Sequence, residues 1–269
     1  MDLVYLGTPE VAVPPLRALV DAGHRIHRVV TGPPRRRARR AEPSPSPVEA
    51  AARLLDLPVA YDLEHLDDCG AQLGVVVAFG RLIPAPLLSR LPMVNLHFSD
   101  LPRWRGAAPV ERAILAGDTS TAVCLMSLEA GLDTGPVHDR VHLEIGDRTA
   151  DSLRAEMSEA GARLLVESLG AGLPAPRPQE GEVTYADKIT RDDLRIDWSG
   201  PPERALRQVR VGGAWTTWRD TVIKIVEATV DDGRLRPVIL RPQGRGDTDF
   251  ESWWRGALTR RRGPRSNRA

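Results

Sequence analysis

The sequence contains few of the features that would place it outside the cytoplasm. It has only two cysteines in 269 residues, Cys69 and Cys124. They lie far apart without metal-ligand spacing, which argues against a disulfide framework and for reduced thiols. No apolar run approaches the ~20 residues that a membrane span needs. The first residues lack the basic and long apolar segments of a secretory signal. These absences predict a cytoplasmic protein.

The sequence also lacks an excess of charge of either sign, since the formal net charge is +1. The overall charge therefore says nothing about partners, but its distribution does. Only Lys188 and Lys224 are lysines, and the arginines gather in the tail and in a proline-rich stretch at 32–47. That stretch is predicted to be a mobile loop. Either a solvated linker or a phosphate contact is consistent with its arginines, which are Arg35, Arg36, Arg37, Arg39 and Arg40.

The first part of the chain alternates strand and helix patterns. Short β-prone or continuously apolar runs occupy 2–6, 28–31, 74–79 and 93–98, and a helical pattern that ends at Gly23 follows the first of them. Such alternation predicts an α/β fold, Rossmann-like, with a mostly parallel sheet and helices on both faces. Ligands of such sheets lie outside the carboxyl ends of the strands.

The composition changes in the second half. A helical pattern at 150–169 is followed by a Gly/Pro-rich stretch and then by β-prone runs at 216–218, 222–226 and 236–240. These runs predict a small β-domain. The predicted organisation is a catalytic domain, a linker, a β-rich domain and a disordered basic tail, at 1–170, 171–184, 185–256 and 257–269 respectively.

The segment 94–118 carries the strongest chemical signal. It reads V-N-L-H-F-S-D-L-P-R-W-R-G-A-A-P-V-E-R-A-I-L-A-G-D. Asn95 and His97 are two residues apart near a strand end, so they point to the same face. Asp133 follows later between Gly131 and Gly135. Each feature alone also fits an ordinary structural histidine or a tight turn.

Taken together, the three polar residues fit an acyl-transfer site. An amide and an imidazolium can donate to a developing oxyanion, and a carboxylate can orient the imidazole or accept a proton. No serine or cysteine nucleophile stands out, which favours direct transfer between two substrates. The candidate catalytic residues are therefore Asn95, His97 and Asp133.

The segment 95–118 resembles the signature of the methionyl-tRNA formyltransferases, a branch of the folate-dependent formyltransferases. The resemblance extends in family order from Leu3 to about Glu227. It includes G-T-P-E at 7–10, P-S-P-S-P-V at 43–48, V-V-A-F-G at 76–80, G-L-D-T-G-P at 131–136, T-Y-A-D-K at 184–188, R-I-D-W at 195–198 and G-A-W-T at 213–216.

This resemblance implies an enzyme that moves a formyl group from 10-formyltetrahydrofolate to the α-amine of methionine on initiator tRNA in bacteria. Asn95 and His97 would polarise the formyl oxygen, and Asp133 would tune His97 and manage protons. The folate would lie along Ser99, Asp100, Leu101 and Pro102, with Phe79 and Gly80 in the pterin wall. The basic loop, Arg35 to Arg40, would contact the acceptor-stem region. We expect no metal, no nicotinamide and a monomer.

The chain departs from the family pattern at four places. Asp100 replaces an apolar residue, which would weaken folate binding if its carboxylate faced the cofactor. Val11 stands where phenylalanine is usual, near the amino-acid pocket. Residues 210–212 replace an aromatic and proline-containing turn. The C-terminal region is short, so the expected OB-like β-domain is truncated.

Two further functions remain open from the sequence. The first keeps the chemistry but changes the acceptor to a small amine, such as an amino sugar or a biosynthetic intermediate. The second is a non-catalytic folate- or RNA-binding paralogue. A nucleotide-dependent oxidoreductase is disfavoured, because G-T-P-E at 7–10 lacks the G-x-G-x-x-G phosphate turn.

Overall fold

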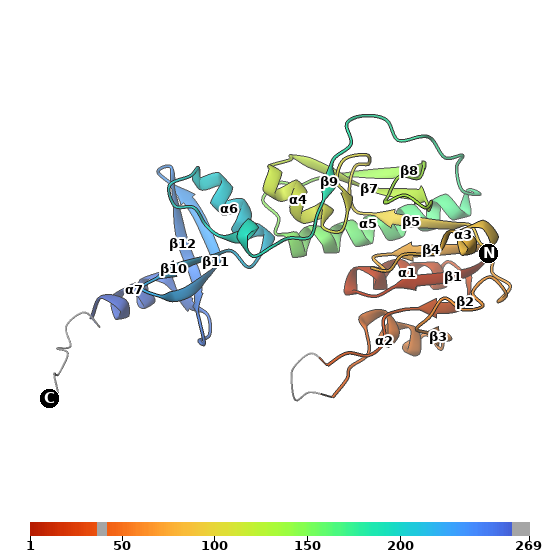
Figure 1. The fold of residues 1–269 in the computed structure, drawn as a ribbon, viewed down its shortest axis with the longest axis horizontal. Coiled ribbons are helices and arrows are strands. Elements are labelled where there is room, and N and C mark those ends of the chain that lie inside the picture. The colour runs from red at the N-terminus through yellow and green to blue at the C-terminus, as the bar shows by residue number, and fades with distance from the viewer. Residues whose placement is uncertain (37–41, 260–269) are drawn as a thin grey trace. The chain divides into compact units, whose positions relative to one another are not determined.

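The computed structural model describes residues 1–36 and 42–259, which form two compact units (Figure 1). Unit 1 comprises Met1–Ala113, Thr119–Gly146 and Asp151–Lys188. Unit 2 comprises Ile114–Asp118, Asp147–Ala150 and the chain from Ile189 onward. Among the described residues, no helix combines the length and apolar character that crossing a bilayer requires.

Unit 1 is built on a seven-stranded sheet with the order β3-β2-β1-β4-β5-β7-β8. The first five strands in this order pair in parallel, whereas β7 and β8 are antiparallel. The predicted mostly parallel sheet is thus confirmed. The strands are β1 (Asp2–Gly7), β2 (Arg25–Val30), β3 (Val59–Ala60), β4 (Leu73–Val77), β5 (Met93–His97), β7 (Ser120–Ser127) and β8 (Val137–Glu144).

The central strands form where the sequence has continuous apolar runs. All residues of β4 and β5 are buried, as are those of β1 after Asp2. Strands covered on both faces need apolar side chains at every position rather than alternation. The predicted strands at 2–6, 74–79 and 93–98 therefore coincide with β1, β4 and β5, and 28–31 overlaps β2.

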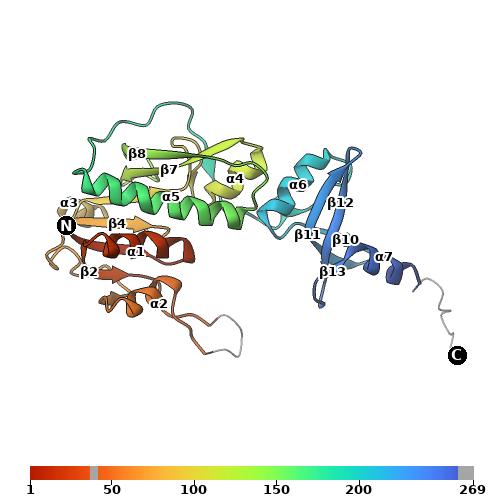
Figure 2. The same ribbon diagram turned by 180° about the vertical axis from the view of Figure 1, so that it is seen from behind.

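Helices pack against this sheet. Figure 2 shows α1 and α5 side by side on one face, and the Ser158 Oγ on α5 donates to the Val11 carbonyl 2.6 Å away, just before α1. The helices of this part are η1 (Glu10–Ala12), α1 (Val13–Asp21), α2 (Pro47–Leu54), α3 (Ala85–Arg90), α4 (Pro109–Ala116) and α5 (Ala150–Gly170). The helix predicted at 150–169 is α5.

The strand order reverses at β1. The chain first adds β2 and β3 on one side of β1 and then returns to add β4 and β5 on the other. The crevice at such a reversal, outside the carboxyl ends of the strands, is where open α/β sheets bind ligands. The carboxyl end of β5, with Asn95 and His97, lies on this edge.

Unit 2 contains a four-stranded antiparallel sheet with the order β10-β11-β12-β13. The strands are β10 (Trp215–Trp218), β11 (Thr221–Asp231), β12 (Arg234–Pro242) and β13 (Thr248–Asp249), so the three predicted β-runs are strands. Helix α6 (Pro202–Val211) supplies Ala205 and Val209 to a core that includes Ile223, Ile225 and Leu240. The short η2 (Asp192–Leu194) precedes α6.

The chain ends differently from the prediction at one point. Helix α7 runs from Phe250 to Thr259, so its last turn occupies positions that were expected to belong to a disordered tail starting at residue 257. The helix is held by aromatic contacts, including the stack of Phe250 on Trp254 at 5.9 Å. The rest of the predicted tail, 260–269, lies outside the described residues.

Candidate active site

Strand β5 presents two polar side chains at its carboxyl end. Asn95 and His97 are buried, with 9% and 6% of their surfaces exposed. Asn95 lies opposite Val76 of β4 and Met126 of β7, so it is held within the sheet. Because the two residues alternate with Leu96, they share one face as expected. In the part of the chain that the structure describes, the Asn95 carboxamide makes no hydrogen bond within the protein.

The His97 ring is fixed by the loop that follows it. Its Nε2 lies 3.0 Å from the Trp104 carbonyl oxygen. A carbonyl can only accept, so Nε2 carries the hydrogen and donates it. Ser99 braces the same loop, since its hydroxyl donates to the Arg103 carbonyl at 2.6 Å. Trp104 adopts a positive φ of 61°, which turns its carbonyl toward the ring.

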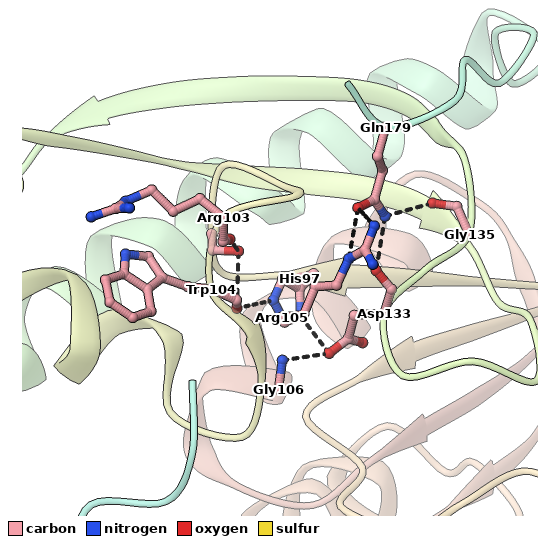
Figure 3. Close-up of polar contacts among 9 residues, drawn as sticks. His97, Arg103, Trp104, Arg105, Gly106, Asp133, Gly135 and Gln179 are labelled. Atoms are coloured by element: carbon pink, nitrogen blue, oxygen red, sulfur yellow. Dashed lines mark hydrogen bonds and ion pairs between the residues drawn. The ribbon is translucent and has the colours of Figure 1, made fainter. Parts of the chain in front are cut away.

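Asp133 faces the other nitrogen of this ring (Figure 3). Its Oδ2 lies 3.6 Å from His97 Nδ1, just beyond hydrogen-bond range. The same oxygen accepts the Gly106 N–H at 2.8 Å. Gly135 lets this loop approach β7, because a Cβ there would lie 1.9 Å from the Ser127 carbonyl oxygen. The structure therefore brings two of the three predicted catalytic residues, His97 and Asp133, together. The third, Asn95, lies two residues before His97 on β5.

Gln179, which the sequence did not reveal, holds the Asp133 loop in place. Gln179 donates from Nε2 to the carbonyls of Asp133 and Gly135, both at 2.8 Å. Its Oε1 accepts two hydrogen bonds from the Arg105 guanidinium, at 3.0 and 2.7 Å (Figure 3). Gln179 thus joins the loop of Asp133 to the loop after β5. No motif in the sequence around Gln179 indicates this role, because Gln179 lies within the predicted linker at 171–184.

Thr184, in the same stretch as Gln179, holds the loop after β5. Its hydroxyl accepts the Trp104 N–H at 2.9 Å, and its carbonyl accepts the Arg105 N–H at 2.9 Å. The pairing continues between β6 (Arg105–Gly106) and β9 (Tyr185–Ala186). The one available sequence signal was the T-Y-A-D-K match at 184–188, which begins at Thr184.

The Asp100 carboxylate, which is 40% exposed, pairs with side chains of β8. Its carboxylate accepts a hydrogen bond from Arg140 of β8 at 2.5 Å, and His142 Nδ1 lies 3.8 Å away. The Arg140 guanidinium also reaches the Leu101 carbonyl at 3.4 Å. The Asp100 carboxylate, which departs from the family signature, is therefore paired with the Arg140 guanidinium of β8.

The other residues predicted to contact folate are mostly buried in the protein itself. Ser99 and Leu101 are 0% and 1% exposed, and the Leu101 side chain packs in a small core cluster. Pro102 is buried, and Phe79 packs among core residues of β1 and β4. Gly80 is exposed, with a φ of 73°. Side-chain contact by Ser99 and Leu101 would require them to leave their present partners.

The predicted basic loop is described only at its ends. Arg35 and Arg36 are exposed, and Arg35 exchanges two main-chain hydrogen bonds with Ser44, at 3.0 and 3.1 Å. Arg37, Arg39 and Arg40 lie outside the described residues.

A cavity of about 1420 Å³ lies beside the site, between η1, α1 and α5. Two of its lining residues, Phe98 and Ala107, are chain neighbours of His97 and Gly106, so the cavity borders the segments that carry the site. Its apolar lining residues include Val11, Ala78, Phe98, Ala107 and Val110. Val11 was singled out from the sequence, and it does line this space.

Cys124 lies next to His97 in the β5–β7 pairing but is not a candidate nucleophile. Its side chain is fully buried, and burial raises the pKa of its thiol to about 11. The reactive form of a cysteine is the thiolate. The site therefore suits a reaction in which an amide, an imidazole and a carboxylate assist transfer between two bound molecules. Its class is that of a group-transfer enzyme without a covalent intermediate.

Comparison with known proteins defines the class further. The formyl transferase family matches residues 3–169. The methionyl-tRNA formyltransferase of Roseobacter denitrificans is 42% identical over 259 residues, covering 90% of this chain and 85% of that protein. The chain belongs to the formyl transferase family, and its similar sequence relatives are methionyl-tRNA formyltransferases.

Solved structures show the same fold at low sequence identity. The methionyl-tRNA formyltransferase from Clostridium thermocellum has a TM-score of 0.68 at 15% identity, covering 91% of this chain and all (100%) of that one. An N-formyltransferase from Helicobacter canadensis, solved with folinic acid and dTDP-3-aminofucose, has a TM-score of 0.67 at 17% identity. The match covers 86% of this chain and 88% of that one. The two scores are nearly equal, so the fold alone does not distinguish a tRNA acceptor from a sugar acceptor.

Proposed function

We propose that this enzyme transfers the formyl group of 10-formyltetrahydrofolate to the α-amine of methionine on initiator tRNA, as a step of bacterial translation initiation in the cytoplasm. The observation that carries the proposal is that Asn95 and His97 lie at the end of β5, with Asp133 facing His97 and the Asn95 amide free to donate. The sequence similarity to curated methionyl-tRNA formyltransferases supports the acceptor.

Asn95 and His97 supply the electrostatic part of the reaction. When the amine attacks the formyl carbon, negative charge develops on the formyl oxygen, and preorganised donors are needed there. The Asn95 amide offers two N–H groups that no protein acceptor takes up within the described residues. The Trp104 carbonyl takes up the Nε2 hydrogen of His97, so the ring can donate to the formyl oxygen only from Nδ1 and in its protonated form.

Asp133 manages the proton. A bond forms between the amine nitrogen and the formyl carbon, and the bond between that carbon and N10 of the folate breaks. The amine loses one proton and N10 gains one. A carboxylate 3.6 Å from His97 Nδ1 can take the proton from the amine and stabilise a protonated ring while it is passed on.

The surroundings fit two substrates. The apolar end of the cavity, around Val11, Phe98 and Val110, suits the methionine side chain. The folate would contact the exposed Gly80 and main-chain atoms of 99–102, since the side chains of Ser99 and Leu101 are buried. The basic loop, Arg35 to Arg40, and the β-rich domain of unit 2 would hold the tRNA through phosphates, which fix position but carry little sequence information.

The test is formylation of methionine-charged initiator tRNA by the purified chain with 10-formyltetrahydrofolate. We expect turnover that His97→Ala lowers by at least ~100-fold, because loss of one oxyanion donor has about that effect. His65→Ala is the matched control, since the His65 side chain is 81% exposed and outside the site. Equal rates for both variants would remove His97 from the mechanism.

A small amine is the competing acceptor, because the sugar N-formyltransferase shares the fold almost equally well. A dTDP-linked amino sugar should therefore be offered in parallel with the charged tRNA. Turnover on the sugar without turnover on tRNA would replace the proposed acceptor. Absence of turnover on both, with folate still bound, would favour a binding paralogue.

A further inference from the structure

A second cavity lies entirely within unit 2. It has a volume of about 580 Å³ and is enclosed by the turn after β10, the loop from β12 to β13 and the start of α7. The residues that matter for its chemistry are Trp218, Arg219, Arg245 and Trp253. The volume is within the range of about 300–1,000 Å³ in which small-molecule sites fall.

Trp218, which lines this cavity, carries an unsatisfied hydrogen-bond donor. Within the described residues, the Trp218 indole Nε1 is buried and has no acceptor. The Trp218 ring is packed edge-on against Trp253, with centroids 6.3 Å apart and planes at 73°. Buried donors without partners are rare in folded proteins, and each one calls for an explanation such as a bound ligand or a water molecule.

The charge of the cavity is positive. Among the described residues that line it, two are arginines and none is acidic. The nearby carboxylate of Asp247 is held by Arg241, through hydrogen bonds of 2.5 and 2.9 Å, so it does not compensate the lining arginines. Arg219 lies against the Trp218 ring, 5.6 Å from its centroid. Arg245 is exposed and forms no ion pair within the described part.

Two tryptophan rings, an indole N–H without an acceptor and two arginines suit one kind of ligand. A nucleotide has a base that stacks on tryptophan, oxygen and nitrogen acceptors for an indole N–H, and a phosphate for guanidinium groups. A free phosphate would use the arginines but leave both indole rings unused. An apolar peptide would use the rings but leave the arginines unpaired.

We infer that this cavity binds one unpaired nucleotide of RNA, with its base against Trp218 and Trp253 and its phosphate on Arg219 and Arg245. The inference rests on the proposed function in one respect, namely that tRNA is the RNA encountered. It is otherwise independent of catalysis, because every residue it uses belongs to unit 2. The site adds an RNA contact that carries stacking as well as charge.

The test follows the indole N–H of Trp218 directly. Spectra of the ¹⁵N-labelled full chain contain indole signals from six tryptophans, and Trp218→Phe identifies the Trp218 signal by its absence. We expect this signal to shift on addition of AMP and of a single-stranded hexaadenylate RNA. No shift with either probe, or a shift reproduced by inorganic phosphate alone, would overturn the inference.

Affinity for the labelled hexamer provides the second measurement. The double change Trp218→Phe with Arg245→Ala should weaken binding about tenfold, the scale of losing part of one stacked and charged contact. Trp218→Phe keeps one aromatic ring but removes the indole N–H and part of a side chain that packs on the core of unit 2. The melting temperature of each variant is therefore measured beside its affinity, so that a loss of stability is separated from a loss of the contact. Arg236→Ala is the control, since Arg236 is an exposed arginine of β12 that does not line the cavity.

The two hypotheses fail in different ways. Formylation of charged tRNA with an unmoved Trp218 signal would reject this nucleotide site and retain the proposed function. Hexamer binding that depends on Trp218 and Arg245, without any formylation, would retain the site and reject the proposed function.

Discussion

At the scale of single residues, Asp100 shows how a neighbour changes the meaning of a substitution. A carboxylate beside an anionic folate should repel it, but the Arg140 guanidinium neutralises this one at 2.5 Å. We therefore predict that Asp100→Asn leaves the KM for the formyl donor within about twofold. Because the two side chains are 40% and 35% exposed, the pair should contribute no more than about 1 kcal/mol to stability.

Steady-state kinetics and urea unfolding of Asp100→Asn, Arg140→Met and the double variant check this prediction. Their changes in free energy should be less than additive, because both single variants remove the same contact. A KM that falls several-fold in Asp100→Asn would show that the carboxylate opposes folate after all.

Cys124 provides a pH-dependent prediction. Burial raises the pKa of its thiol from the ordinary 9.0 to about 11, so the folded state favours the neutral form. Its contribution to stability is complete below pH 9 and is lost as the pH rises through about 11, a difference of roughly 2 to 3 kcal/mol. Cys124→Ala should therefore flatten the decline in unfolding free energy between pH 9 and 11.

Urea unfolding at pH 8, 9.5 and 10.5 measures this effect. Cys69→Ala is the control, because Cys69 is only partly buried. Burial also raises the pKa of Tyr5, but Tyr5 is present in both variants and affects their alkaline decline equally. An alkaline decline that is the same in the wild type and Cys124→Ala would contradict the assignment.

At the scale of elements, the sequence predicts the strands well and the loops that serve them poorly. Apolar runs define β1, β4 and β5, and the Asn-x-His spacing defines which face carries the site. The stretch 171–184 looks like a linker because it is rich in glycine and proline. In the structure it runs along unit 1, where Arg177 exchanges two hydrogen bonds of 2.8 Å with Val137. Such long-range pairing has no local pattern, so periodicity cannot reveal it.

Gln179 is the residue through which that stretch acts on the site. We predict that Gln179→Leu lowers kcat about tenfold, because the carbonyls of Asp133 and Gly135 and the Arg105 guanidinium all lose partners. Gln179→Glu retains the acceptor for Arg105 but cannot donate to the two carbonyls. It should match Gln179→Leu if donation to the Asp133 loop is what positions the carboxylate.

A stability effect alone would not explain this loss if the control behaves as expected. Gln208 of unit 2 is buried, whereas Gln179 is half-buried, and it likewise donates from Nε2 to two carbonyls, those of Asp193 and Arg195, at 2.7 and 3.0 Å. Gln208→Leu should lower the melting temperature to a similar extent and leave kcat nearly unchanged. Equal loss of kcat in both variants would reduce Gln179 to a structural residue.

At the scale of the whole molecule, the fold class and the order of its two parts follow from composition and periodicity, but the cavities do not. The alternation of apolar runs predicts the parallel sheet, and the later β-prone runs predict the sheet of unit 2. The cavity of about 1420 Å³ arises from the distance between α1 and α5, which are separated by more than a hundred residues in the chain. The sequence pointed to this cavity through Val11, which the family resemblance places near the amino-acid pocket.

The net charge of +1 leads to the last prediction. A chain so nearly neutral has no general attraction for RNA, so any salt dependence of tRNA binding must come from local contacts. Replacing Arg35, Arg36, Arg37, Arg39 and Arg40 by alanine should raise the KM for charged tRNA and reduce the slope of log K against log salt by about one for each arginine that contacts a phosphate. The KM for the formyl donor serves as the internal control and should not change. Titrations of tRNA binding between 50 and 200 mM salt measure the slope. A slope equal to that of the unmodified chain would show that these arginines do not contact the tRNA and would leave its phosphates to other basic residues.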